Sequence, residues 1–398
     1  MKTQALQHLF APLDKEAQEV LNNFDSLVQS VKPLNSKHLQ TLPDTIRELS
    51  HQLTDERSSR RVGYMNQAAY LSAYTRYYLW WNLVRLTSLF AGFPSDAFSH
   101  LEDGSYCMDA GSGPLTVPIA LFLSRPELRQ KKITWYCIDL SQTALSLGEE
   151  LFLAVCASLQ CEPWSIVRIK GSLGEKLNNP VQLCTCANMF NEMYWDSSKP
   201  LEELSKKYTE MLLPYMSKDT NSILIVEPAV PRTARFISLT RDALLRRKYS
   251  IISPCPHEKI CPMDGRRGGK WCHFVLNTDN APKKLHSLSK DAGIPKERAA
   301  LSFVFATMPQ NPASGESGLM SVRIASDPIR IPSKGLARYA CSELGLTLIF
   351  ETSICSGKQT PCSSGDLINL PSLTDTQKRQ LPLDAKTGAK IIGGRYDS

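Results

Sequence analysis

The chain has 398 residues, enough for two or three domains, and its 42% hydrophobic and 21% charged content is typical of a folded globular protein. A formal charge of +7 permits a nucleic-acid partner without requiring one. No stretch approaches the roughly 18 consecutive apolar residues of a membrane span. The N-terminus shows neither a secretory signal nor a transit peptide, so we expect a cytoplasmic protein without a membrane partner.

Residues 1–95 are predicted to form a helical region. The run "AAYLSAYTRYYLWWNLVRLTSLF" places its aromatic and aliphatic side chains mostly at helical spacings. Such a stripe could stack on nucleic-acid bases, but a helix face buried against the next domain is the favoured interpretation.

Residues 96–250 are predicted to form a Rossmann-like α/β domain. The short apolar runs "YCMDA", "ITWYCID", "SIVRIKG", "VQLCTCAN" and "SILIVEP" are each followed by a helix-length segment or a longer insertion. This alternation is typical of a parallel sheet that is covered by helices on both faces.

The remainder of the chain divides into two predicted parts. Residues 251–352 contain a Cys-rich loop and then strand-like runs such as "ALSFVFATM" and "LTLIFETS", which indicate a β-rich region. Residues 353–398 are polar and rich in Pro, Ser and Lys, and we expect a loosely ordered tail.

A glycine-rich turn follows the first predicted strand. The sequence "CMDAGSGPLTVPIALFL" places Asp109, Gly111 and Gly113 where a strand turns into a helix, so the backbone can approach a ligand closely. Position 116 is Thr where the dinucleotide fingerprint requires a third glycine, so a pyrophosphate need not be the ligand. Asp109 instead suits a cationic ligand that carries an amino acid. Asp139, at the end of the second strand, can accept both hydroxyls of an adenosine ribose.

This ordered pair of motifs resembles class I S-adenosylmethionine-dependent methyltransferases. The resemblance implies that Asp109, Gly111, Gly113 and Asp139 bind the methyl donor, and the alternative is a Rossmann-like domain with a degenerate pocket. The segment "ANMFNEMYW" lacks the Asn-Pro-Pro-aromatic signature that binds an exocyclic amine in amino-methylating enzymes. Cys186 invites comparison with the nucleophile of cytosine-5 methyltransferases, but its apolar strand favours a buried thiol. No catalytic base or nucleophile can be named from the sequence.

Twelve cysteines in a reducing compartment are not expected to form disulfides. Five of them lie in apolar runs, and we interpret these as buried and inert thiols: Cys107, Cys137, Cys156, Cys184 and Cys186. The cysteines of "SPCPHEKICPMDGRRGGKWCHF" have polar, turn-forming neighbours and require another explanation.

Cys255, Cys261 and Cys272 look like three ligands of a metal site that needs a fourth. Histidines beside a ligating cysteine are poorly placed to reach the same metal, so we interpret His257 and His273 as hydrogen-bonding residues of the loop. Three further cysteines remain as candidates, of which the first lies on a strand-like run and the others in the predicted tail: Cys341, Cys355 and Cys362. The short C-x2-4-C knuckle of zinc sites is missing. The longer spacings suit an iron–sulfur cubane better, and spacing alone leaves zinc as an alternative.

The motifs "PCPHEKICP", "WCHF" and "RYACSELGLTL" closely resemble the methyltransferase-like family of mitochondrial small-ribosomal-subunit assembly proteins and their bacterial relatives. The resemblance runs from about Tyr64 to about Phe350. It implies a class I methyltransferase fold with a 4Fe-4S cluster, whose ligand positions fall on four residues: Cys255, Cys261, Cys272 and Cys341. Because no transit peptide is visible, we expect a bacterial, cytoplasmic member.

The resemblance implies a protein that binds S-adenosylmethionine and acts on the small ribosomal subunit or its rRNA, with no DNA partner. The alternative is an inactive rRNA-binding assembly factor that uses the fold as a scaffold. Basic residues before and within the Cys-rich loop fit phosphate contacts. The candidates for RNA binding are Arg246, Arg247, Arg266, Arg267 and Lys270, and Arg241 and Lys248 belong to the same basic run.

Overall fold

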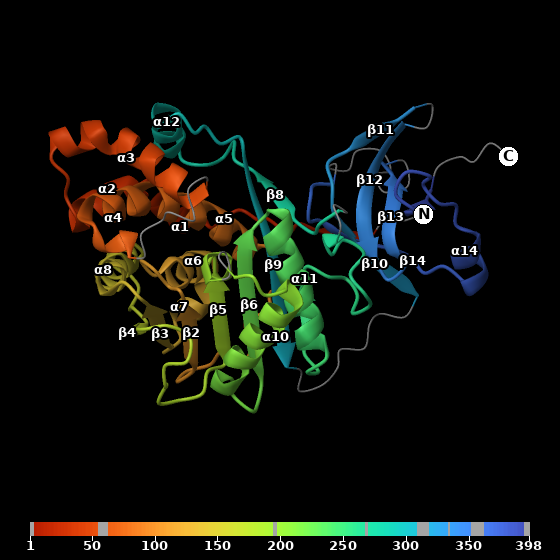
Figure 1. The fold of residues 1–398 in the computed structure, drawn as a ribbon, viewed down its shortest axis with the longest axis horizontal. Helices are drawn as coiled ribbons and strands as arrows, with labels where there is room; N and C mark the ends of the chain where they lie inside the picture. The colour runs from red at the N-terminus through yellow and green to blue at the C-terminus, as the bar shows by residue number, and fades with distance from the viewer. Residues whose placement is uncertain are drawn as a thin grey trace.

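A computed structural model describes residues 4–54, 63–193, 197–266, 270–308, 318–332, 335–351 and 362–393. Over these residues the chain forms two β-sheets that lie side by side, and helices pack around the first of them (Figure 1). We call the sheet that is surrounded by helices the main sheet and the other one the C-terminal sheet. Within the same residues, every helix is too short or too polar to cross a membrane.

The main sheet contains eight strands in the described part of the chain. They are β2 (Tyr106–Ala110), β3 (Thr134–Asp139), β4 (Ser165–Lys170), β5 (Leu183–Ala187), β6 (Asn221–Pro228), β7 (Ser250–Ser253), β8 (Phe274–Asn277) and β9 (Arg298–Met308). The order is β4-β3-β2-β5-β6-β9-β7, and β8 pairs with β9. Strands β2 to β6 are parallel, whereas β9 is antiparallel to β6 and β7. The predicted Rossmann-like α/β class is therefore confirmed.

The central strands of the main sheet are buried on both faces, because their side chains alternate between two cores. Cys107 and Trp135 face one core, and their neighbours Met108 and Tyr136 face the other. The helices that accompany these strands are α6 (Thr116–Ser124), α7 (Pro126–Arg129), α8 (Gln142–Ser158), α9 (Phe190–Met193), α10 (Leu201–Leu212), η3 (Leu213–Tyr215), α11 (Pro231–Leu245) and α12 (Lys283–Asp291). The prediction of five buried thiols is confirmed for Cys107, Cys137, Cys156, Cys184 and Cys186.

The N-terminal region is helical, as predicted. Its elements after the short strand β1 (Gln4–Gln7) are α1 (Lys15–Asn22), α2 (Phe24–Val31), α3 (Ser36–Thr54), η1 (Tyr64–Asn66), α4 (Ala68–Ala73), the π-helical η2 (Tyr74–Leu79) and α5 (Trp80–Ala91). Trp80 and Trp81 are buried, and their indole N–H groups donate to Leu21 O and Ser289 Oγ. The buried part of the aromatic stripe therefore faces the core, as the favoured interpretation expected.

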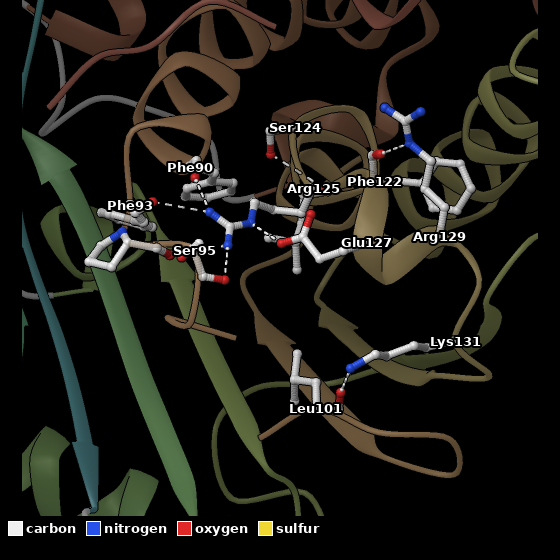
Figure 2. Close-up of polar contacts among 12 residues, drawn as sticks. Phe90, Phe93, Ser95, Leu101, Phe122, Ser124, Arg125, Glu127, Arg129 and Lys131 are labelled. Carbon is white, nitrogen blue, oxygen red and sulfur yellow. Dashed lines mark hydrogen bonds and ion pairs between the residues drawn. The ribbon is translucent and has the colours of Figure 1, made fainter. Parts of the chain in front are cut away.

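Arg125 connects the end of α5 to the main domain (Figure 2). Its guanidinium is buried and donates to four backbone carbonyl oxygens at and beyond the end of α5: those of Phe90, Phe93, Pro94 and Ser95. Its Nε also donates to Glu127 Oε1 at 2.6 Å. A cation at a helix C-terminus satisfies carbonyl groups that have no partner within the helix and complements the helix dipole.

The C-terminal sheet has seven strands among the described residues, in the order β1-β14-β10-β12-β13-β15, with β11 paired to β12. Its later strands are β10 (Leu319–Ile324), β11 (Ile329–Ile331), β12 (Gly335–Ser342), β13 (Gly345–Phe350), β14 (Leu367–Pro371) and β15 (Lys390–Ile392), and helix α14 (Asp375–Gln380) follows β14. All pairings are antiparallel except that of β13 with β15.

Two segments differ from the sequence-based expectation. Strand β9 lies in the main sheet, although we placed it in the C-terminal β-rich region, because it inserts between β6 and β7. The segment expected to be a loose tail contributes β14, α14 and β15, and β14 is held between β10 and β1. The predicted domain bounds themselves stay a prediction.

Candidate functional site

The turn after β2 is left-handed at three positions. Gly111, Gly113 and Leu115 have φ angles of 68°, 50° and 57°. Glycine adopts this conformation without strain, whereas a buried leucine does so only when its surroundings hold it there. A Cβ atom on Gly111 would lie 2.6 Å from Cγ of Met189. The backbone conformation and this close approach therefore account for glycine at position 111.

The two predicted carboxylates flank this turn. Asp109 is buried, and its oxygens accept hydrogen bonds from Ser112 Oγ and Thr185 Oγ1, both at 2.7 Å. Asp139 accepts from the Gly113 N–H through Oδ2 at 2.9 Å and from the Ser141 N–H through Oδ1 at 2.8 Å. Each carboxylate oxygen of Asp139 keeps a lone pair, so it can still accept a ligand hydroxyl.

One cavity of about 320 Å³ brings these residues together. It lies at the carboxyl ends of the parallel strands, at the point between β2 and β5 where the strand order reverses, which is where open α/β sheets bind ligands. All four predicted donor-binding residues line it: Asp109, Gly111, Gly113 and Asp139. The N-terminal helical region supplies part of the wall through Tyr64, Met65, Tyr74 and Asn82.

Burial raises the pKa of Asp109 to about 7, although the Thr185 and Ser112 hydroxyls oppose the shift. Between about pH 4 and pH 7 the folded protein therefore retains a proton that the unfolded chain has lost, so the free energy of unfolding falls as pH rises through this window. Asp109→Asn should flatten that decline by about 2 kcal/mol between pH 5 and pH 7. Urea unfolding of both proteins at pH 5, 6 and 7 measures the difference, and parallel profiles would contradict it.

The loop after β5 forms a further wall of the cavity through residues such as Asn188 and Met189. Glu227, at the end of β6, is fully buried and accepts hydrogen bonds from the Phe190 and Asn191 N–H groups at 2.8 and 3.2 Å. Burial raises the pKa of Glu227 to about 8. Cys186 is buried, and burial raises the pKa of its thiol well above the ordinary range, as expected for an inert thiol.

The four predicted metal-binding cysteines converge from both sheets. Cys255, Cys261 and Cys272 lie in the loop between β7 and β8, and Cys341 lies on β12. Burial raises the pKa of the Cys272 thiol well above its ordinary value, and the neighbouring thiols of the other three cysteines raise it further. The described residues contain no group of three or more His, Cys, Asp or Glu side chains arranged to hold a metal ion. The effect of the other three thiols on the pKa of Cys272 shows that the four are neighbours. A bound metal and its identity stay a prediction.

Two buried arginines face these thiols. Arg241 donates from Nε to Cys255 Sγ at 3.1 Å and from Nη2 to the carbonyl oxygens of His257 and Lys259 at 2.8 Å. Arg323, on β10, donates to Pro254 O at 2.7 Å, and its guanidinium is close enough to interact with the thiols of Cys255 and other cysteines of the group. Arg241 is only 2% exposed, so its inclusion in the surface basic run was wrong. It packs against the Cys-rich loop from within.

The other ligand candidates have different surroundings. His257 Nε2 lies 3.1 Å from Cys341 Sγ, which makes this histidine a hydrogen-bonding partner of the predicted fourth ligand. His273 Nδ1 is 3.1 Å from Trp271 O. Cys362 is buried in the core of the C-terminal sheet with Val322 and Ile368. Cys355 lies outside the described residues.

The predicted RNA-binding residues have unequal surroundings. Arg246 is exposed at the end of α11. Arg247 and Arg266 are each engaged by an acid, with Arg247 Nη2 at 3.0 Å from Glu210 and Arg266 Nε at 2.5 Å from Asp264. The ammonium of Lys270 lies over the ring of Tyr339. Arg267 lies outside the described residues.

Sequence reasoning missed three residues at these sites. Glu227 was visible as an acid that ends a strand, in "SILIVEP", but no rule assigned it a role. Asn188 lies in the segment "ANMFNEMYW", for which we noted only that the Asn-Pro-Pro-aromatic signature is missing. Nothing in the sequence indicated that Arg323 belongs to a site, because an arginine in a strand-like run is usually a solvent-exposed charged residue.

A family model described as mitochondrial small ribosomal subunit Rsm22 matches residues 105–343, which is more than half of the chain. No curated protein matches the chain.

Similar solved structures include a provisionally assigned RNA methyltransferase from Pyrococcus horikoshii, with 12% identity, 58% of this chain and 83% of that chain covered, and a TM-score of 0.32. Others are S-adenosylmethionine-dependent methyltransferases in complex with S-adenosylhomocysteine. The one from Geobacter sulfurreducens has 14% identity and a TM-score of 0.31, and the match covers 57% of this chain and 90% of that chain. The one from Thiobacillus denitrificans has 12% identity, coverage of 56% and 90%, and a TM-score of 0.31. At such low scores, these likenesses assign nothing to this chain.

Proposed function

The chain belongs to the Rsm22 family of mitochondrial small-ribosomal-subunit proteins, and on this premise we propose that it binds S-adenosylmethionine and acts on the small ribosomal subunit or its rRNA as a methyltransferase. The observation that carries the proposal is the cavity at the strand-order reversal, which contains a left-handed glycine turn and two carboxylates. The expectation of a cytoplasmic location stays a prediction, since the family description names mitochondria.

The cavity offers complementary groups to each part of the methyl donor. Asp139 keeps lone pairs for the two ribose hydroxyls. Asp109 lies beneath the turn, where a ligand ammonium group would favour its ionised form and reverse the effect of burial on its pKa. The left-handed turn brings the backbone of residues 111–113 close to the ligand, as the glycine-rich turns of Rossmann folds do.

Asp139→Ala should weaken the binding of S-adenosylmethionine and S-adenosylhomocysteine by about 5- to 150-fold, because hydrogen bonds to a charged group contribute about 1–3 kcal/mol. Isothermal titration calorimetry with S-adenosylhomocysteine gives the affinity. Asp219→Ala is the matched control, because Asp219 is exposed and precedes β6 at the opposite edge of the sheet. Equal affinities in folded wild type and Asp139→Ala would remove Asp139 from the site.

We further infer that Cys255, Cys261, Cys272 and Cys341 hold a 4Fe-4S cluster, with zinc as the alternative. Proximity of the four thiols supports this, as does the presence of two buried guanidinium groups beside them. Arg241 already pairs with Asp242 at 2.7 Å, and metal-bound thiolates would add negative charge beside both guanidinium groups. Such a centre would be structural, because it would join the loop between β7 and β8 to β12 in the second sheet.

The rival function is an rRNA-binding scaffold without catalysis, and the absence of a nameable catalytic base favours it. Both functions share the predicted RNA contacts of Arg246, Arg247, Arg266, Arg267 and Lys270, of which Arg246 is exposed at the end of α11. Protein purified without oxygen should be assayed for donor binding and for transfer of labelled methyl groups to small-subunit particles. Binding of particles without donor binding or transfer would favour the scaffold.

A further inference from the structure

Trp271 differs in exposure from the other tryptophans among the described residues. Those four are at most 3% exposed and lie in one hydrophobic core: Trp80, Trp81, Trp135 and Trp164. Trp271 is only half-buried, in the Cys-rich loop next to Cys272. A tryptophan that served packing alone would bury its ring as the other four do, so the accessible part of Trp271 requires another explanation.

The ring of Trp271 is held in one orientation. Its Nε1 donates to Ala229 O at 3.1 Å, and the ring stacks against that of His273 with centroids 5.4 Å apart and planes at 25°. His273 is half-buried as well. The backbone between them is also fixed, because the Cys272 N–H donates to Met263 O at 2.9 Å. Trp271 and His273 therefore form a preorganised pair of rings, which we call the aromatic platform.

Basic side chains predominate around the aromatic platform. Within the described parts of residues 229–235 and 263–273, four side chains are basic and one is acidic: Arg232, Arg235, Arg266, Lys270 and Asp264. Glu202 of α10 adds a second acid through its ion pair with Arg235. The side chain of Arg266 is 65% exposed, and Asp264 contacts it through Nε, so its other donors can bind a phosphate. This excess of positive charge favours a polyanionic partner.

The aromatic platform adjoins the cavity through the end of β6. Ala229, which accepts from the Trp271 indole, lies two residues after Glu227, whose carboxylate holds the loop that lines the cavity. The start of α11 lies beside the platform, because a Cβ atom on Gly265 would be 3.5 Å from both Arg235 Cβ and Trp271 Cβ. An RNA strand with one nucleotide in the cavity would therefore bring a neighbouring nucleotide to this surface.

We propose that the aromatic platform stacks with a base of single-stranded RNA, beside the nucleotide that would enter the cavity. This inference rests on the RNA contacts of the proposed function and adds a contact to the bases, which the basic residues alone do not make. Single strands offer bases with free faces, whereas a duplex keeps its bases stacked on one another. Stacking on an aromatic ring tolerates every base, so the platform would orient a strand without selecting its sequence.

The test compares two labelled RNA probes of about 12 nucleotides, a length that one binding surface can span. One is an unstructured strand of mixed sequence, and the other is an abasic strand with the same number of phosphates. Fluorescence anisotropy gives their affinities for the full chain, purified without oxygen. We expect the strand with bases to bind at least about fivefold more tightly, because stacking contributes about 5- to 150-fold per base.

Trp271→Leu and Trp271→Phe form a matched pair of variants, since both lose the hydrogen bond to Ala229 but only the second retains a ring. Trp271→Leu should bind the two strands within about twofold of each other, whereas Trp271→Phe should retain part of the preference. Both should keep the iron content of the wild type, which excludes an indirect effect through Cys272.

Arg266→Glu provides the opposite pattern. It should flatten the salt dependence of binding and keep the preference for bases, whereas Trp271→Leu should keep the salt dependence, because its phosphate contacts remain. Full preference in Trp271→Leu would overturn the inference, as would equal losses in both Trp271 variants or a wild type that binds the two strands equally.

Three further results separate this inference from its premise. If the preference and its loss in Trp271→Leu are found in a protein that binds no S-adenosylhomocysteine, the inference holds and the proposed methyltransferase function fails. If the wild type binds S-adenosylhomocysteine but neither strand, the inference is wrong and donor binding stands. If Trp271→Leu weakens binding to isolated small-subunit proteins and not to RNA, the surface contacts a protein and the inference is wrong.

Discussion

Cys341→Ser is expected to lose most of its bound iron and to loosen the C-terminal sheet, whereas Cys362→Ser retains the iron. Protein purified without oxygen should be brown and contain about four irons per chain, the content of one cubane. Cys341 is the proposed ligand on β12, while the other three proposed ligands lie in the loop between β7 and β8. Its removal would break the connection between the two sheets and take away the folding energy that a structural metal site supplies.

Iron content per chain and hydrogen exchange over residues 318–351 measure these two effects. Cys362→Ser is the matched control, because Cys362 is also a buried cysteine of the C-terminal sheet but lies in its apolar core. Colourless protein with one zinc per chain would replace the cubane by a four-cysteine zinc site. Full iron retention in Cys341→Ser would show that Cys341 is not the fourth ligand, and His257, which contacts it, would be examined next.

Arg125→Ala is expected to lower the free energy of unfolding by about 3–5 kcal/mol. The substitution removes the donor shared by four backbone carbonyl oxygens around the end of α5, and each buried acceptor left unpaired costs about 1–3 kcal/mol. It also removes the packing of the guanidinium against the Phe98 ring, whose centroid is 5.2 Å away. Urea unfolding followed by tryptophan fluorescence gives the difference.

Two further variants should lose less stability than Arg125→Ala, whose contacts are shown in Figure 2. Arg125→Lys keeps the charge but cannot reach carbonyl oxygens on two sides at once, so it should recover only part of the loss. Arg168→Ala removes a partly exposed ion pair with Glu149 and should change stability by less than about 1 kcal/mol. A loss in Arg125→Ala no larger than that in Arg168→Ala would mean that water replaces the guanidinium at no cost.

The sequence predicted those parts of the site that follow from local backbone chemistry. Gly111 and Gly113 were identifiable because glycines at a turn from a strand into a helix let the backbone approach a ligand closely, and the structure places both in the left-handed conformation. Asp139 was identifiable because a carboxylate that ends a parallel strand must lie at the ligand-binding edge. The buried thiols were identifiable from their apolar neighbours.

The remaining features depend on packing between distant segments. Strand β9 follows the Cys-rich loop in the chain, yet it inserts between β6 and β7, and no periodicity within its residues indicates that position. Arg241 resembled surface charge, because only the folded loop reveals that it packs against Cys255. The side-chain oxygen of Asn188 is buried without a hydrogen-bond partner only in the folded structure, so no motif could indicate it.

The pairing of β1 with β14 has a consequence for the order of folding during synthesis. His8 and Asp366, which follow β1 and precede β14, are 358 positions apart and in contact at 3.1 Å. Residues 4–7 leave the ribosome long before β14 does, so their backbone groups wait unpaired while the residues between the two strands are translated. The main sheet can assemble once β9 has emerged, whereas β1 can pair only after β14 has emerged. Contacts of such long range form slowly, so a nascent chain exposes these unpaired backbone groups until β14 arrives.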